Sequence, residues 1–236
     1  MKIRRKIIAG ILAASMVATA GTVPSAAHAE ENPADGAERI VASLNFDDET
    51  VGDASAVTKS WADYTGNITY AEGRTGKAIQ LDGYGLRLNQ KNVGAEYTVS
   101  MWMKHDSVLA ENQQILFLGH GDSSSENWLD IGGDRGSNRT YEIWTRNTTA
   151  SSEISGWNYL DESVPQITGE WVMLTVTGDG NSFRAYVNGQ QVELTGGGMT
   201  DASIRNAANV LNGENQDIYV GVNYWDTAFS GLVDDI

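Results

Sequence analysis

Apolar and polar side chains alternate along most of the chain from Ile40 to Ile236. Successive side chains of a β-strand point to opposite faces, so this alternation is typical of strands with one buried face. The segments that carry it are RIVASLNFDD (39–48), KAIQLDG (77–83), YGLRLNQ (84–90), YTVSMWMK (97–104), QQILFLG (113–119), TYEIWTR (140–146), EWVMLTV (170–176), SFRAYVN (182–188) and DIYVGVNYW (217–225). The pattern predicts about a dozen short strands. Only residues 201–211 (DASIRNAANVL) are expected to form a short helix.

Tight turns separate these segments. The sequences GDGN (178–181) and VNGQ (187–190) contain Asp-Gly and Asn-Gly pairs, which adopt the positive φ angles of hairpin turns. Many short strands with turns between them predict an all-β fold of two antiparallel sheets packed face to face, a jelly-roll sandwich. Because no internal repeat or low-complexity linker interrupts the pattern, residues 40–236 are expected to form one domain.

Inward-facing side chains of the two sheets are expected to fill a layer about 10 Å thick. Trp102 and Trp171 lie in strand-like runs and are expected in this layer as well. The other residues predicted to be buried are Leu44, Phe46, Ile79, Leu81, Val99, Met101, Met103, Leu116, Leu118, Ile143, Met173, Val176, Phe183, Tyr186, Val220 and Val233.

Residues 1–29 have the pattern of a bacterial export signal. Four basic residues precede an apolar run over 7–17 and the sequence AHA at 27–29, which predicts cleavage near Ala29. The apolar run is too short for a comfortable membrane span. We therefore predict a secreted, extracellular protein, with a polar leader over 30–39 ahead of the domain.

The chain is acidic, with 236 residues, a formal net charge of −15 and no cysteine. The predicted signal carries four of the 16 basic residues and none of the 31 acidic ones, which leaves 12 − 31 = −19 for the mature chain. Nucleic acids and anionic membranes both require a basic face, so neither is expected as a partner. Without cysteine, stability must come from a packed core and not from disulfides.

A family resemblance rests on six motifs in a fixed order: LNFDD, GRTGKAIQLDGYG, YTVSMWMK, GEWVMLTVTGDGNSFRAYVNGQQV, DIYVGVNYW and FSGLVDDI. The order resembles the laminin-G-like branch of the concanavalin A-like jelly rolls, modules common in secreted bacterial glycoside hydrolases and notably in arabinan-degrading ones. In that family the last strand usually continues past the Asp-Asp pair, whereas here the sequence stops at Ile236. The resemblance therefore implies a truncated final strand and a catalytic domain further along a longer chain.

The same resemblance implies a structural calcium ion between the first and last strands. The matching residues are Asp47, Asp48, Asp234 and Asp235, and carboxylates are ligands that Ca²⁺ prefers. The alternative is that one aspartate of each pair faces solvent while the other caps a turn. Thermal unfolding in excess chelator, compared with millimolar calcium, distinguishes the two.

The sequence offers little for catalysis. Catalytic relatives of this fold carry Glu-x-Asp-x-x-Glu on one strand, whereas Glu126, Asp130 and Asp134 are spaced by four residues and Glu142 stands alone. His120 lies in a glycine-flanked loop beside Asp122 and several serines, but neighbours within one loop do not form a nucleophilic relay. No catalytic residue is therefore predicted.

Aromatic residues in polar surroundings suggest a sugar-binding surface, because aromatic faces stack on sugar rings while amides and carboxylates bind hydroxyl groups. Trp128 lies in such surroundings. The residues predicted to form the surface are Trp157, Tyr159, Tyr224 and Trp225, with Asn158, Asn223, Asp226 and Asp130 as polar partners. The alternative is that these residues pack loops onto the sheet edges.

Three functions follow from these observations. The first is a non-catalytic carbohydrate-binding or accessory module of a secreted glycan-degrading enzyme, whose partner is a polysaccharide or another glycan. The second is a surface module for adhesion or recognition. The third, a free-standing glycosidase of the concanavalin-like fold, is disfavoured because the acidic strand motif is missing.

Overall fold

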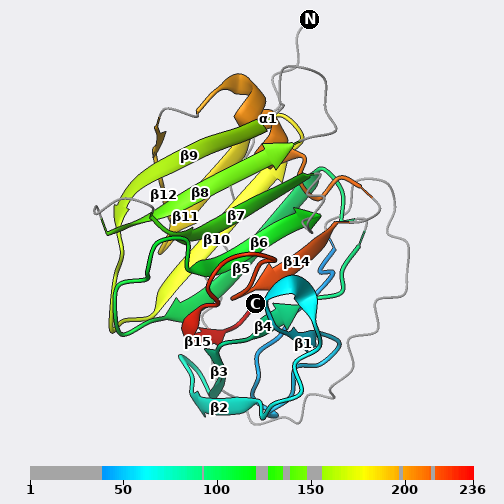
Figure 1. Ribbon diagram of the computed structural model, residues 1–236, viewed down its shortest axis with the longest axis vertical. Coiled ribbons are helices and arrows are strands. Elements are labelled where there is room, and N and C mark those ends of the chain that lie inside the picture. Colours follow the sequence, from blue (N-terminus) through cyan, green and yellow to red (C-terminus); the bar gives the residue numbers. More distant parts are fainter. Residues whose placement is uncertain are drawn as a thin grey trace, which may run out of the picture. The chain divides into compact units, whose positions relative to one another are not determined.

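The described part of the chain is built around two antiparallel β-sheets, as the sequence predicts (Figure 1). The computed structural model describes residues 39–91, 93–120, 127–134, 139–147, 156–196, 199–213 and 216–236, with the backbone alone for 156–164. The predicted signal peptide and nearly all of the leader lie outside the described residues. No helix within the described ranges has the length and apolar character needed to cross a membrane.

Each sheet is a continuous series of hydrogen-bonded strands. From one edge to the other, the first has eight: β1 (Ser55–Val57), β4 (Gly85–Arg87), β14 (Asp217–Val220), β6 (Gln114–His120), β7 (Asn127–Gly133), β8 (Thr140–Asn147), β9 (Gly156–Pro165) and β13 (Leu194–Thr195). The second has seven: β12 (Gln190–Gln191), β11 (Phe183–Val187), β10 (Val172–Asp179), β5 (Glu96–Lys104), β15 (Ser230–Asp234), β3 (Lys77–Asp82) and β2 (Thr69–Glu72).

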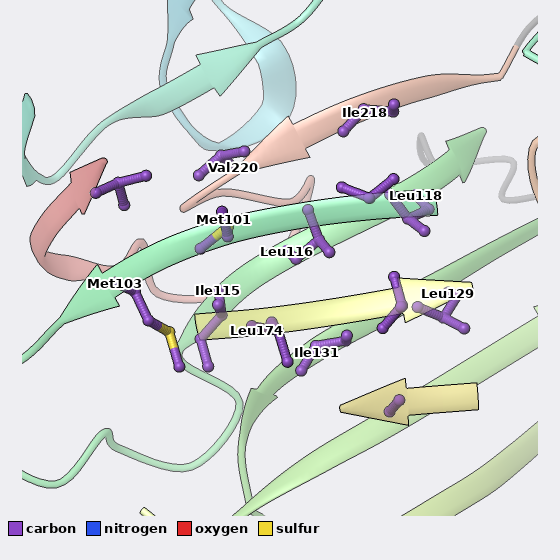
Figure 2. Packing of buried hydrophobic residues seen from close by; sticks show 14 of the residues in the cluster. Met101, Met103, Ile115, Leu116, Leu118, Leu129, Ile131, Leu174, Ile218 and Val220 are labelled. Atoms are coloured by element: carbon purple, nitrogen blue, oxygen red, sulfur yellow. The ribbon is translucent and has the colours of Figure 1, made fainter. Parts of the chain in front are cut away.

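Apolar side chains from both sheets meet in one core. Figure 2 shows Met101 and Met103 of β5 and Leu174 of β10 beside leucine and isoleucine side chains of the eight-stranded sheet. Of the residues predicted to be buried, thirteen are buried and Leu44 packs against the core from a half-buried position. The buried ones are Phe46, Ile79, Leu81, Val99, Met101, Met103, Leu116, Leu118, Ile143, Val176, Phe183, Val220 and Val233.

The predicted register is wrong by one residue for part of β10 and β11. Met173 and Tyr186 are only half-buried, because the inward positions belong to Val172, Leu174 and Val176 and to the alternate residues of β11. The sequence also predicts Trp102 and Trp171 in the core, whereas both are half-buried. Trp102 lies outside the core because Met101 and Met103 occupy the inward positions of β5.

The turns and the single described α-helix agree with the predictions made from the sequence. Gly180, Asn188 and Gly189 all have positive φ, as the two predicted hairpin turns require. Helix α1 (Asp201–Ala208) lies within the predicted range and begins after Thr200, whose Oγ1 accepts a hydrogen bond from the Ser203 amide.

The first and last described segments lie side by side. Leu44 and Ile236 exchange two backbone hydrogen bonds, with N···O distances of 3.0 and 2.9 Å. Strand β15 pairs with β3 on one side and β5 on the other, so the last strand is an interior strand of its sheet. The predicted meeting of the two segments is therefore confirmed.

Candidate functional site

The outer face of the eight-stranded sheet carries a second group of packed aromatic residues, separate from the core. Since Leu116, Leu118, Leu129 and Ile131 belong to the core, their neighbours along β6 and β7 face the other way. We call this group the aromatic cluster: Val57, Phe117, Trp128, Trp144, Tyr219 and Val222, with Trp61, Trp225 and Ala228 packed against it.

The strand register aligns residues in rows across the sheet. The central row runs Arg87, Tyr219, Phe117, Asp130, Trp144 and Tyr159, from β4 to β9. The next row contains Trp128, Arg146 and Trp157. Residues directly opposite one another in an antiparallel sheet share a face and lie close enough to interact. A carboxyl group therefore stands in the middle of a row of aromatic residues.

Two loops cover part of the aromatic cluster. The loop that contains the 3₁₀ turn η1 (Lys59–Trp61) stacks Trp61 on Tyr219, with ring centroids 4.7 Å apart and an interplanar angle of 12°. The loop after β14 places Trp225 with its ring centroid 5.6 Å from that of Trp128. The two loops are joined where the Ser60 amide donates a hydrogen bond to the Tyr224 carbonyl, at 3.1 Å. Each loop thus presents a half-buried tryptophan at the edge of the cluster.

Three acidic residues gather beside the aromatic cluster, and we call Asp130, Glu142 and Asp226 the acid cluster. Asn223 is fully buried, and its Nδ2 donates to Asp130 Oδ2 at 3.3 Å and to Asp226 Oδ2 at 2.7 Å. Gln114 Nε2 donates a further hydrogen bond to Asp130 Oδ2 at 3.3 Å. Two carboxyl groups are therefore held close together by a neutral amide.

Asn223 also shapes the loop that carries Trp225. Its Oδ1 accepts hydrogen bonds from the backbone amides of Trp225 and Asp226, at 2.9 and 2.7 Å. An asparagine side chain that binds amides two and three residues ahead forms an Asx-type turn. The same residue thus fixes the position of the tryptophan and of two carboxyl groups.

The electrostatics of the site centre on Asp130, whose residue surface is only 6 % exposed. Burial raises the pKa of the Asp130 carboxyl well above its ordinary value, and the negative charges of Asp226 and Glu142 raise it further. The hydrogen bonds from Asn223 and Gln114 oppose this rise. A buried carboxyl with a strongly perturbed pKa, beside other acids, is a common mark of a functional site.

Asp130→Asn is expected to stabilise the protein at alkaline pH and to flatten its pH dependence. Near pH 4 the Asp130 carboxyl is largely protonated in the folded state, and an unfolded aspartate has a pKa of about 3.9. As the pH rises towards the raised folded-state pKa, the unfolded chain releases its proton first, so stability falls. Asparagine keeps an acceptor for Asn223 and Gln114 but carries no charge. The expected gain is about 1–3 kcal/mol at pH 8 and close to zero at pH 4.

Urea unfolding at the two pH values measures this effect. Asp82→Asn, at an exposed position at the end of β3, is the matched control and should change the free energy of unfolding little at either pH. A gain of equal size at both pH values would contradict the assignment, because it would not depend on the charge of Asp130.

The structure brings five of the predicted sugar-surface residues together: Asp130, Asn223, Tyr224, Trp225 and Asp226. Trp157, Asn158 and Tyr159 lie in β9 opposite Arg146, Thr145 and Trp144, and their side chains lie outside the described part of the structure.

Sequence reasoning misses part of the site. It predicts Trp128 in a polar loop, whereas this residue lies in β7 and is 1 % exposed. Phe117, Trp144 and Glu142 are not among the residues predicted for the surface. A signal is present, because Ile115 to Leu118 is an unbroken apolar run, which indicates a strand buried on both faces.

The four aspartates predicted to bind calcium occupy the junction of the first and last segments. Asp47 Oδ1 accepts from the Lys77 amide at 2.9 Å, and Asp234 Oδ2 accepts from the Arg74 amide at 2.9 Å. Asp48 and Asp235 are exposed. These backbone hydrogen bonds fit the turn-capping alternative. Within the described ranges no group of three or more acidic or histidine residues is arranged to hold a metal ion, and calcium binding stays a prediction from the sequence.

A family model for the concanavalin A-like lectin/glucanases superfamily matches residues 76–236. The chain belongs to this superfamily. No curated protein matched the sequence.

Two solved structures with a similar fold agree with the assignment. Domain 4 of AbnA, a GH43 extracellular arabinanase from Geobacillus stearothermophilus solved with arabinotriose, is 26 % identical, with a TM-score of 0.62, and the match covers 82 % of this chain and 88 % of that domain. The enzymatically active domain of a bacteriophage CBA120 tailspike protein is 12 % identical, with a TM-score of 0.52 over 77 % of this chain and 27 % of that one. The first is a domain of an extracellular glycan-active enzyme, and the second supports the fold alone.

Proposed function

We propose that the chain is a non-catalytic carbohydrate-binding module of a secreted glycan-degrading protein, and that it binds sugar on the outer face of the eight-stranded sheet. The observation that carries the proposal is the pair of half-buried tryptophans, Trp61 and Trp225, which lie with Asp226 at the edge of the aromatic cluster, above a row of buried aromatic residues. The likeness to an arabinanase domain solved with arabinotriose supports it.

The chemistry of this face suits a sugar. A sugar ring has apolar C–H faces that pack on aromatic rings and hydroxyl groups at its rim that require hydrogen-bond partners. Trp61 and Trp225 are half-buried at the edge of the aromatic cluster, where a ligand can reach them. Asp226 is half-buried next to Trp225 and offers carboxylate oxygens to hydroxyl groups.

Binding without catalysis is favoured by how the carboxyl groups are held. Retaining and inverting glycosidases place two carboxyl groups on either side of the scissile bond. Here Asp130 is buried and its Oδ2 accepts hydrogen bonds from Gln114 and Asn223. The predicted location outside the cell and attachment to a catalytic domain belong to the same proposal, supported by the export-signal pattern and by the extracellular arabinanase neighbour.

Trp225→Ala is expected to weaken glycan binding about tenfold or more, because it removes a half-buried tryptophan from the edge of the aromatic cluster. The wild type is first tested by affinity electrophoresis and calorimetry on arabinotriose, arabinan and a panel of soluble polysaccharides. Trp171→Ala is the matched control, since Trp171 is half-buried just before β10 of the other sheet.

Equal loss in both variants would place the sugar elsewhere on the molecule. Failure of the wild type to bind any carbohydrate in the panel would overturn the proposed function. Release of reducing ends from a polysaccharide would show that the chain is catalytic. The carboxyl groups of the acid cluster would then be the candidate catalytic groups.

A further inference from the structure

The 3₁₀ turn η1 holds two consecutive residues in a left-handed backbone conformation. Ser60 has a φ of 62° and Trp61 has a φ of 58°. Residues other than glycine rarely adopt this conformation, and for a bulky side chain such as tryptophan it is a genuine outlier. Such strain persists only where the surroundings over-determine it, and it gathers at ligand-binding sites. The fold therefore keeps Trp61 in place against the preference of its backbone.

Hydrogen bonds on both sides hold this turn. The Trp61 amide donates to the Thr58 carbonyl at 3.0 Å. Ser60 reaches the loop after β14 twice, since its amide and its Oγ both donate to the Tyr224 carbonyl, at 3.1 and 3.2 Å. Figure 1 shows the turn, in cyan, next to β14. The two loops that border the aromatic cluster are therefore joined into one unit.

Three half-buried rings follow one another along these joined loops, and we call Trp61, Tyr224 and Trp225 the aromatic strip. The ring centroids of Trp61 and Tyr224 are 5.5 Å apart, with an interplanar angle of 79°. Those of Tyr224 and Trp225 are 5.7 Å apart, at 67°. Tyr224 contacts both tryptophans edge-on, so the rings form an extended row and not the two walls of a pocket.

An extended row of rings suits a chain of sugars. A sugar ring is similar in size to one aromatic ring, so three rings in a row offer contacts to more than one sugar unit. Because the strip is already ordered, a chain that contacts one tryptophan can contact the other without a further ordering cost in the protein. The second contact forms within the same complex, where the effective concentration is high. Affinity is therefore expected to rise steeply with chain length.

We propose that the aromatic strip binds at least two consecutive sugars of a glycan chain, and that Ser60 is a positioning residue that holds Trp61 in line with Trp225. This inference rests on the proposed sugar-binding function and adds the class of ligand to it, which is a chain segment and not a single sugar.

Calorimetry with sugars of increasing length tests the chain segment. The wild type is titrated with arabinose, arabinobiose and arabinotriose, and with the mono-, di- and trisaccharides of any other polysaccharide in the panel that it binds. The trisaccharide is expected to bind about tenfold or more tightly than the monosaccharide. Trp61→Ala and Trp225→Ala are each expected to bring this affinity ratio close to one. Trp171→Ala, at the other sheet, should leave the ratio unchanged.

Ser60→Gly tests the positioning role. Glycine adopts a φ of 62° without strain, but it lacks the Oγ donor and leaves the turn more flexible. The melting temperature is expected to be retained, while the affinity for the trisaccharide falls several-fold and that for the monosaccharide does not change. A purely structural role would lower the melting temperature and leave the affinity ratio intact.

The outcomes separate this inference from the function beneath it. Equal affinity of the wild type for mono- and trisaccharide would overturn the chain segment while leaving sugar binding intact. An unchanged ratio in Trp61→Ala, or an equal fall in Trp171→Ala, would also overturn it, because the strip would then not be the surface that the chain spans. Trp61→Leu, which keeps an apolar side chain against Tyr219, replaces Trp61→Ala if that variant does not fold.

An unchanged ratio in Ser60→Gly would overturn the positioning role of Ser60. No binding to any carbohydrate would overturn both this inference and the proposed function.

Discussion

Removal of residues 230–236 is expected to leave the chain unable to fold. Strand β15 is an interior strand, so its loss separates β3 and β2 from the rest of the seven-stranded sheet and leaves the backbone groups of β5 unpaired. It also removes Val233, a fully buried core residue. Because domains are stable by only about 5–15 kcal/mol, the combined loss exceeds what the rest of the fold supplies.

Circular dichroism and dispersion of amide proton resonances measure the result. A point-variant pair tests the same strand without truncation: Val233→Asp buries a charge in the core, whereas Leu232→Asp is made at a half-buried position on the other face. The first should unfold the protein and the second should be tolerated. A folded truncated chain, or equal effects of the two substitutions, would show that β15 is dispensable.

Asn223→Ala is expected to cost about 2–4 kcal/mol of stability and to abolish measurable glycan binding. The substitution removes the amide between Asp130 and Asp226 and leaves these buried or half-buried carboxyl groups without it. It also removes the acceptor for the Trp225 and Asp226 amides, so the turn that positions Trp225 is lost. This one substitution is therefore expected to lower both the stability of the fold and the affinity for glycan.

Asn89→Ala is the matched control. The Asn89 side chain also makes two hydrogen bonds, to the Asp53 carbonyl and to Ser55 Oγ, but Asn89 is exposed. Its loss should cost about 1–2 kcal/mol, because Asn89 also has a positive φ that alanine adopts less readily, and it should leave binding intact. If Asn223→Ala proved as mild as the control, the Asx-type turn would not be what holds the tryptophan.

Periodicity predicts the fold well where one face of a strand meets solvent. In β3 and β5 the alternation is clear, and Ile79, Leu81, Val99 and Met101 are all buried as expected. It fails at Met173 because residues 171–174 are apolar at every position, so the pattern does not say which alternate set points inward. A one-residue shift then exchanges the two faces.

The candidate site shows a different limit. Polar sequence context singles out Asp130, but its neighbours depend on pairings between β6, β7, β8 and the loop after β14. Asn223 lies 93 positions from Asp130, and no local spacing reveals that contact. Trp128 and Trp144 are missed because alternation assigns one face of each strand to solvent, whereas here loops cover that face as well.

The paired ends of the described fold also determine how the molecule responds to mechanical load. Leu44 and Ile236 exchange two backbone hydrogen bonds as an antiparallel pair, so a force that pulls Leu44 towards its N-terminal side and Ile236 towards its C-terminal side acts at the same end of the pair. A force applied through the backbone at these two residues peels the pair open one hydrogen bond at a time and does not shear many bonds at once. The sandwich is therefore expected to begin yielding under small forces at this corner, while the eight-stranded sheet and its aromatic face are still intact.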